Sequence, residues 1–145
     1  MDNLDRAILD LLRQNARAGY GDIGSSVGLS ASAVKRRVDR LVDDGVIRGF
    51  TVVLDPHPMG WTTEAYVEVH CQGAISPDEL RRGFAKVPEV HGAATVSGPA
   101  DAILHLVAED VRDLERALER VRDETANIAH TNTSIVLSRL VHRYA

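Results

Sequence analysis

The apolar residues have different spacings at the start of the chain and directly after the DPHP stretch of residues 55–58. Over residues 4–42, apolar residues recur every three or four positions, as on one face of a helix. After the DPHP stretch, residues 62–71 alternate apolar and polar side chains, as in a strand with one buried face. We therefore predict a helical module over residues 1–50, a linking strand and hinge over 51–61, and a second module over 62–145.

The first module predicts three helices separated by short turns. The first covers residues 4–14, and a shorter second helix begins near Gly19. Gly28 then supplies a left-handed turn, and Ser30 caps a third helix that ends at Gly45. The β-rich stretch that follows, residues 46–54, predicts a small wing or a linking strand.

Positive charge is concentrated on the third helix, although the formal net charge of the chain is -4. Small residues open its exposed face and long cationic side chains follow within one turn, as a recognition helix in the major groove of DNA requires. A cationic triplet alone is more often a solvated helix face, but the three-helix context favours DNA binding. We predict base-edge or groove contacts for Ser32, Lys35 and Arg36, and phosphate contacts for Arg37 and Arg40. The candidate DNA-binding residues are Ser30, Ser32, Lys35, Arg36, Arg37 and Arg40.

Composition separates the two modules and narrows the class of protein. Residues 1–50 hold 8 Lys and Arg against 7 Asp and Glu, whereas the remainder holds 9 against 14, so we expect the second module to face away from DNA. The single cysteine, Cys71, excludes an intrachain disulfide and a paired-thiol metal site. The N-terminus does not resemble a signal peptide and no apolar run reaches membrane-spanning length, so we expect a cytoplasmic protein without a membrane partner.

The second module predicts the order βαββαβ. Its expected strands cover residues 62–71, 90–97, 102–108 and 128–140, with a helix starting at the SPDE motif of residues 76–79 and another over residues 111–121. This order predicts an α+β, ferredoxin-like sheet with both helices on one face. The other face is left open, and twofold self-association is the commonest way to cover it.

The two modules together resemble the Lrp/AsnC family of transcriptional regulators. The resemblance rests on several motifs in order: LDRAIL at residues 4–9, NAR at 15–17, VGLS at 27–30, VKRRV at 34–38, GVIRGF at 45–50, GPAD at 98–101 and TNT at 131–133. It implies a winged helix-turn-helix domain joined to an effector-binding, oligomerising domain, with dimers that assemble to octamers or similar rings. It also implies regulation by an amino acid or a similar small metabolite, and we expect no required cofactor. Gly19 and Gly24, where the family commonly has a capping serine and an alanine, predict a less rigid second helix.

The resemblance places the effector between dimers, near one loop and one strand. Glycine lets the backbone approach a ligand, amides and hydroxyls hold its carboxylate, and Asp101 pairs with its ammonium group. The alternative for the loop is a β-turn in which Asp101 makes a local contact. Pro99 removes a backbone donor where the family often has an acidic or amide residue, so amino-acid binding is altered or lost. The candidate effector-binding residues are Gly98, Pro99, Ala100, Asp101, Thr131, Thr133 and Ser134.

Two other classes of function compete with a regulator. Siroheme decarboxylases have a similar architecture and use histidines, and this chain has six, of which His70 and His105 fall on strands predicted to be neighbours. None is paired at short metal-ligand spacing, so we predict no metal site. The chain also lacks a nucleophile motif, a phosphate loop and paired catalytic carboxylates, so we predict that it is not an enzyme. A metabolite sensor without DNA binding would leave Lys35, Arg36 and Arg37 unexplained.

Overall fold

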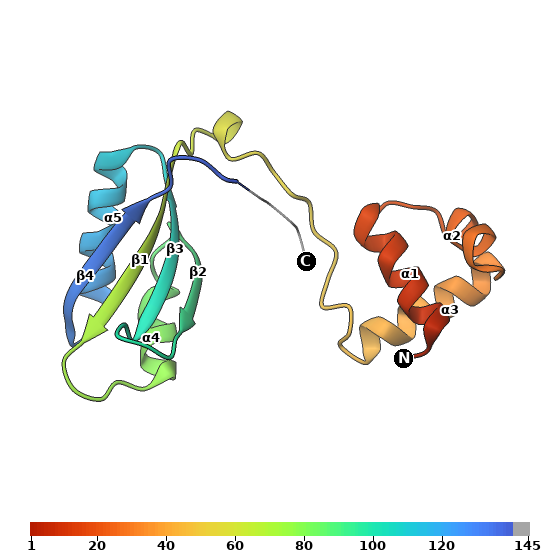
Figure 1. Ribbon diagram of the computed structural model, residues 1–145, viewed down its shortest axis with the longest axis horizontal. Coiled ribbons are helices and arrows are strands. Elements are labelled where there is room, and N and C mark those ends of the chain that lie inside the picture. The colour runs from red at the N-terminus through yellow and green to blue at the C-terminus, as the bar shows by residue number, and fades with distance from the viewer. Residues whose placement is uncertain (141–145) are drawn as a thin grey trace. The chain divides into compact units, whose positions relative to one another are not determined.

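The computed structural model describes residues 1–140, which form two compact units that divide between Val53 and Leu54. Residues 141–145, which the sequence analysis assigned to the second module, lie outside the described residues. The predicted order of helices and strands is confirmed (Figure 1). The first unit contains α1 (Asn3–Gln14), α2 (Tyr20–Val27) and α3 (Ala31–Asp43), and the second contains the 3-10 turn η1 (His57–Met59), β1 (Thr63–Cys71), α4 (Pro77–Phe84), β2 (Val90–Thr95), β3 (Ala102–Ala108), α5 (Val111–Glu124) and β4 (Ile128–Ile135).

The three helices of the first unit begin and end where their capping residues place them. Asp2 caps α1 in a capping box with Asp5, and the Ser30 hydroxyl caps α3 by accepting a hydrogen bond from the Ala33 amide at 3.2 Å. Gly28 has a φ of 71°, the left-handed conformation that the turn between α2 and α3 requires. The helices enclose a small apolar core of Ile8, Leu12, Ile23, Val34 and Val38.

Gly24 is required by packing between α2 and the turn that follows it. A Cβ built at Gly24 would lie 2.4 Å from the backbone oxygen of Leu29, closer than any side chain tolerates. The Leu29 amide donates to the Gly24 carbonyl oxygen at 2.9 Å, so the two segments are in direct contact. Gly24 therefore permits a close approach that fixes α2 against the turn. The expectation of a less rigid helix did not take this contact into account.

The expected wing or linking strand is not formed. Residues 44–62, all of which the structure describes, contain turns and the 3-10 turn η1 but no strand. The β-branched residues of this stretch have no neighbouring strand to pair with, and strands need a partner for their backbone hydrogen bonds. Val46, Phe50, Val52, Val53 and Leu54 are consequently exposed.

The second unit is the expected ferredoxin-like sheet, with strand order β2-β3-β1-β4 and every pair antiparallel. Helices α4 and α5 pack on the same face (Figure 1). The alternation in β1 is as predicted, since Ala65, Val67 and Val69 are fully buried beneath the helices and Tyr66 is exposed. The last strand ends at Ile135 rather than at residue 140, because the segment beyond it makes only one backbone bond to β1, from the Val136 amide to Glu64.

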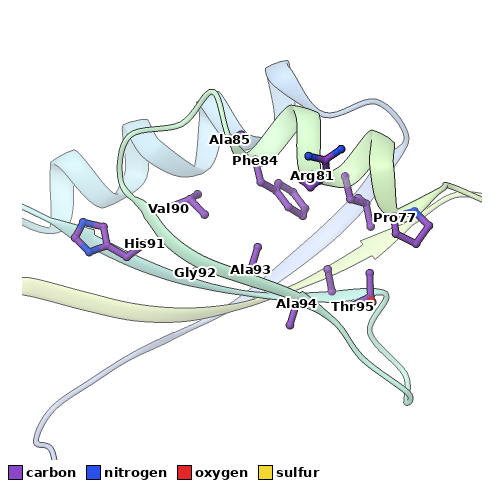
Figure 2. Close-up of a pocket in the computed structure, with 12 residues that line it drawn as sticks. Pro77, Arg81, Phe84, Ala85, Val90, His91, Gly92, Ala93, Ala94 and Thr95 are labelled. Atoms are coloured by element: carbon purple, nitrogen blue, oxygen red, sulfur yellow. The ribbon is translucent and has the colours of Figure 1, made fainter. Parts of the chain in front are cut away.

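A hollow of about 350 Å³ lies between α4 and the edge strand β2 (Figure 2). Phe84 and Leu80 of α4 form its apolar wall, Ala93 and Val90 line the strand side, and Arg81 lies at its rim. None of the seven predicted effector-binding residues lines it. The hollow and the predicted effector region are therefore separate places on the second unit.

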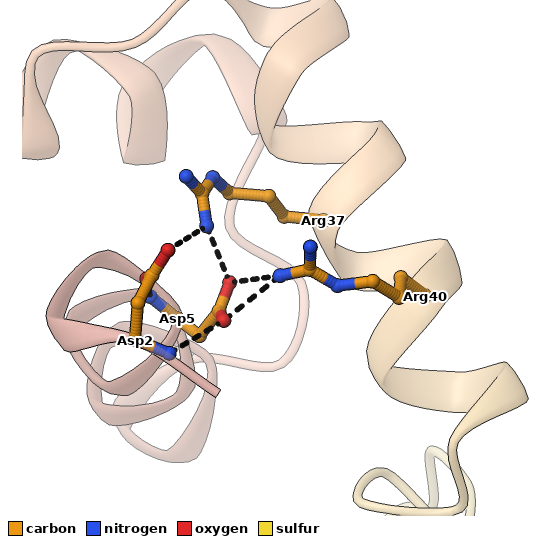
Figure 3. A network of polar contacts seen from close by, with 4 residues as sticks. All are labelled: Asp2, Asp5, Arg37 and Arg40. Atoms are coloured by element: carbon orange, nitrogen blue, oxygen red, sulfur yellow. Dashed lines mark hydrogen bonds and ion pairs between the residues drawn. The ribbon is translucent and has the colours of Figure 1, made fainter.

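A buried carboxylate connects α1 to α3 (Figure 3). The side chain of Asp5 is fully buried, and its oxygens accept hydrogen bonds from Arg37 Nη1 at 2.7 Å and from Arg40 Nη2 at 2.9 and 3.0 Å. Arg37 Nη1 also contacts Asp2 at 2.7 Å. The hydrogen bond from the Asp2 amide, followed by the bond from Arg37, lowers the pKa of Asp5. These bonds fix the rotation of α3 about its axis relative to α1.

We expect Asp5→Ala to destabilise the first unit by about 3 kcal/mol, near the lower end for removing one member of a buried ion pair, because Arg40 stays half exposed. The free energy of unfolding is measured by urea titration of the full chain, with the helical circular dichroism signal as the probe. Because the pKa of Asp5 is lowered in the folded state, this stabilisation is present above the unfolded carboxyl pKa near 4 and is lost as the pH falls below it. Asp10→Ala, an exposed carboxylate on the same helix, is the control and should change stability by less than about 0.5 kcal/mol.

Candidate nucleic-acid interface and effector region

The N-terminal end of α3 presents two serines, of which one is used by the helix itself. The Ser30 hydroxyl caps the helix and lies 3.1 Å from the Ser32 hydroxyl. Both residues are exposed. Ser32 is therefore the serine whose hydroxyl is left for a contact outside the protein, and Ser30 holds the helix end in shape.

The cationic side chains of α3 differ in what they already bind. Lys35 Nζ donates to Asp39 Oδ2 at 2.6 Å, one helical turn away, and this hydrogen bond raises the pKa of Lys35. Arg37 and Arg40 face α1, where they bind Asp5. Arg36 is exposed and makes no ion pair within residues 1–140. It is the side chain of α3 whose charge is most available to a polyanion.

The protein partners of Arg37 and Arg40 were missed by sequence reasoning, although a signal for them was present. Asp5 shares the inward face of α1 with Ile8 and Leu12, because positions i, i+3 and i+7 lie on one side of a helix. A carboxylate on a buried stripe requires a cationic partner. The predicted phosphate contacts of Arg37 and Arg40 stay a prediction, to which the structure adds a role inside the protein.

The loop between β2 and β3 lies against the end of β1. The Asp101 amide donates to the Val69 carbonyl oxygen at 2.9 Å, and the Asp101 carboxylate accepts from the Cys71 amide at 2.7 Å, where the pairing of β1 with β4 shifts register. Asp101 therefore holds the loop to a neighbouring strand through both its backbone and its side chain, and its carbonyl oxygen also accepts from the Val96 amide of the same loop. Its predicted bond to an effector stays a prediction. Gly98 and Pro99 are exposed, Ala100 is buried, and a Cβ added at Gly98 would meet open space.

The predicted effector residues of β4 lie across β1 from this loop. Thr131 pairs with Val69, which also pairs with Ala102 on the other side, so the loop and Thr131 are two strand spacings apart, or about 10 Å. Thr133 shares the helix-covered face with Thr131, whereas Ser134 is opposite Tyr66 on the open face. A single chain therefore does not gather these residues around one small molecule.

Arg122 of α5 is a residue near this region that sequence reasoning missed. Its guanidinium donates to the Thr131 hydroxyl at 3.0 Å and is exposed. It lies in the last turn of α5, where a cation is ordinary, so its position in the sequence carried no signal. The contact places a carboxylate-binding group beside a predicted effector residue.

Three of the histidines, His70, His130 and His105, lie on the open face of the sheet in two groups. His70 and His130 are cross-strand partners whose rings stack at 4.2 Å, and His105 Nε2 lies 2.6 Å from Glu64 Oε1. The expectation that His70 and His105 are on neighbouring strands is confirmed, but His105 is opposite Tyr66 rather than beside His70. Within residues 1–140, no three His, Cys, Asp or Glu side chains are arranged to hold a metal ion.

The described helices include none that is both long and apolar enough to cross a lipid bilayer.

The comparisons with known proteins agree with this architecture over both units. The model of the AsnC-type helix-turn-helix domain matches residues 1–42, and the model of the Lrp/AsnC ligand binding domain matches residues 64–145. The chain is 51% identical to the HTH-type transcriptional regulator Rv2324 of Mycobacterium tuberculosis, over 99% of this chain and 96% of the relative. It is 33% identical to the regulator AldR of the same organism, over 97% of this chain and 79% of that protein.

A solved structure extends the likeness to the fold. The feast or famine regulatory protein Rv3291c of M. tuberculosis, complexed with L-methionine, superposes with a TM-score of 0.90 at 30% identity, covering 97% of this chain and 95% of that one. The named relatives are transcriptional regulators rather than enzymes, which overturns the decarboxylase alternative and confirms the prediction of a non-enzyme. The chain therefore belongs to the Lrp/AsnC family and is a transcriptional regulator with a DNA-binding helix-turn-helix and a ligand-binding domain.

Proposed function

We propose that this regulator binds double-stranded DNA with the exposed face of α3 in the major groove, and that an amino acid controls this binding through self-assembly of the chain. The observation that carries the DNA-binding part is the division of charge on α3. Ser32, Lys35 and Arg36 face outward, while the opposite side is held to α1 by a buried carboxylate. A helix that must insert into a groove needs a fixed orientation and a free cationic face, and α3 has both.

Arg37 and Arg40 take different parts in this proposal. The Arg37 side chain is only 21% exposed and binds both Asp2 and Asp5, so it positions α3. The Arg40 side chain is 54% exposed and binds Asp5 through one nitrogen, so its remaining donors are available to a DNA phosphate. Ser30 supports the helix end from which Ser32 reaches the groove.

An amino acid is the proposed effector because the domain that would hold it belongs to the ligand-binding family and a relative was solved with L-methionine. The groups around the loop suit an amino acid: exposed backbone at Gly98 and Pro99, the Asp101 carboxylate for an ammonium group, and the Arg122 guanidinium for a carboxylate. Because these groups are separated within one chain, a second chain would complete the site.

Self-association is proposed from the apolar surface that a single chain leaves exposed. The unpaired segment of residues 46–54 exposes five large apolar side chains, and Ile135, Leu137 and Leu140 are exposed at the end of the sheet unit. A soluble chain rarely keeps so many such residues in contact with water. We propose a twofold dimer in which these segments and the open sheet face are covered, with assembly to an octamer or similar ring. Twofold symmetry predicts operator half-sites about one helical turn apart, or a multiple of that.

The DNA-binding part is tested with duplexes from the region upstream of the regulator's own coding sequence, in competition with random DNA. We expect Arg36→Ala to weaken binding by at least about tenfold and to lower the slope of log K against log salt by about 1, because one cationic contact is lost. Arg13→Ala, an exposed arginine on α1, is the matched control and should leave both quantities unchanged. Equal effects of the two variants would contradict the assignment of α3. Absence of any DNA binding by the wild type would favour a sensor without DNA binding.

The effector part is tested by measuring DNA affinity and oligomer mass with and without L-methionine and other amino acids. We expect one of them to change both quantities in the wild type. Gly98→Val should abolish that response without changing affinity for DNA in the absence of effector, since the added side chain meets open space in the chain itself. No response of the wild type to any amino acid would contradict the effector proposal.

The assembly part is tested by light scattering on the purified protein. The wild type should have at least twice the chain mass of 15.8 kDa. Val52→Asp should shift the population toward monomer, because the carboxylate would be buried in the proposed interface. Val111→Asp makes the same substitution at an exposed valine at the N-terminal end of α5 and should leave the mass unchanged. A monomeric wild type would refute the dimer.

A further inference from the structure

We propose that Lys35 and Asp39 read one G·C base pair as a unit, with Lys35 donating to guanine and Asp39 accepting from the amino group of cytosine. This makes Asp39, an anion on a DNA-binding face, a residue that determines sequence specificity. The inference rests on the proposed DNA binding by α3 and adds to it the identity of one base pair that each recognition helix selects.

The geometry places Asp39 within the reading face rather than beside it. Ser32, Lys35, Arg36 and Asp39 occupy positions i, i+3, i+4 and i+7 of α3, which form one continuous stripe along a helix. The Lys35 and Asp39 side chains are 62% and 52% exposed, and Nζ lies 2.6 Å from Oδ2. The stripe therefore presents a hydrogen-bond donor and a hydrogen-bond acceptor side by side.

A G·C pair displays the complementary arrangement in the major groove. Guanine presents the acceptors N7 and O6, and cytosine presents the N4 amino donor next to them. Because O6 and N4 are hydrogen-bonded to each other in the base pair, they are about 2.9 Å apart, close to the spacing of the ion pair. An ammonium group with three donors bonds N7 and O6 together, and the adjacent carboxylate meets N4.

An A·T pair does not offer this order. Its adenine amino group lies between the acceptors N7 and O4, so an ammonium group at the same place finds a donor beside it and loses one of its two bonds. The thymine methyl group lies next to O4, and this apolar group is a poor neighbour for the charged side chains of Lys35 and Asp39. Binding the wrong base pair therefore leaves a desolvated charge without its partner, which is how polar sites discriminate.

The ion pair has a second consequence for specificity. Before DNA binds, Asp39 neutralises Lys35, so the free cation of the stripe within the described residues is Arg36. A carboxylate in the groove also repels phosphates, which weakens attachment to DNA of any sequence. As an exposed pair one turn apart, Lys35 and Asp39 add little to helix stability, so substitution of either should leave the fold intact.

The experiment selects binding duplexes from a random pool with the full-length wild type, Asp39→Ala, Lys35→Ala and the control Asp10→Asn, which also removes one negative charge from the first unit. We expect the wild type and the control to select G·C at one position per half-site, where exchange to A·T lowers affinity about 5- to 100-fold. Asp39→Ala should reduce this ratio to less than about twofold, bind random DNA more tightly, and show a salt slope steeper by about 1. Lys35→Ala should also lose the preference, while binding random DNA no more tightly than the wild type.

Two results would overturn the proposal. If Asp39→Ala keeps the wild-type preference, or weakens binding to all sequences equally with helicity unchanged, the ion pair does not read a base, although the DNA-binding function stands. If the wild type itself selects no sequence over random DNA, the proposed function fails and the base assignment fails with it. Circular dichroism of each variant separates loss of the helix from loss of recognition.

Discussion

The orientation of the DNA-binding helix depends on one buried carboxylate. Apolar packing of α1 against α3 is favourable but non-directional, so it specifies the rotation of one helix on another less strictly than hydrogen bonds do. The Asp5 oxygens bind Arg37 and Arg40 at distances from 2.7 to 3.0 Å, and a buried charge that loses such partners is costly. The bonds therefore select one rotation of α3. That rotation turns Lys35 and Arg36 outward, so a contact inside the protein sets which side chains are exposed for the proposed contact with DNA.

This arrangement explains why an acidic chain concentrates cations on one helix. The cations on one side of α3 bind carboxylates at the start of the chain, and those on the other side are exposed. Arg37 and Arg40 neutralise carboxylates of α1, and Lys35 is neutralised by Asp39. In the proposed function only part of this positive charge is left for DNA, so we expect moderate attraction to any phosphate backbone and a larger share of the binding free energy from base contacts. A regulator that must find few sites among many benefits from that balance.

Local sequence signals predicted most of the elements, and the failures share a physical cause. The cap at Ser76 and the alternation of β1 depend on residues within a few positions, and both are as expected. The wing of residues 46–54 was expected from β-propensity, yet a strand forms only where another strand pairs with it. The bonds of Asp101 to Cys71 and of Arg122 to Thr131 join different elements, at separations of 30 and 9 residues, so the pattern within one helix or strand did not contain them.

The positions of the predicted effector residues support the proposal that ligand binding and assembly are one process. Asp101 and Thr131 lie on opposite sides of β1, and Ser134 lies on the other face of the sheet from Thr131. An amino acid is too small to bridge these groups in one chain, yet a second chain can bring its own copy of one group beside another group of the first. A ligand held in this way binds the assembled state more tightly than the separated one. It must then shift the equilibrium toward assembly, because a ligand always favours the state for which its affinity is higher.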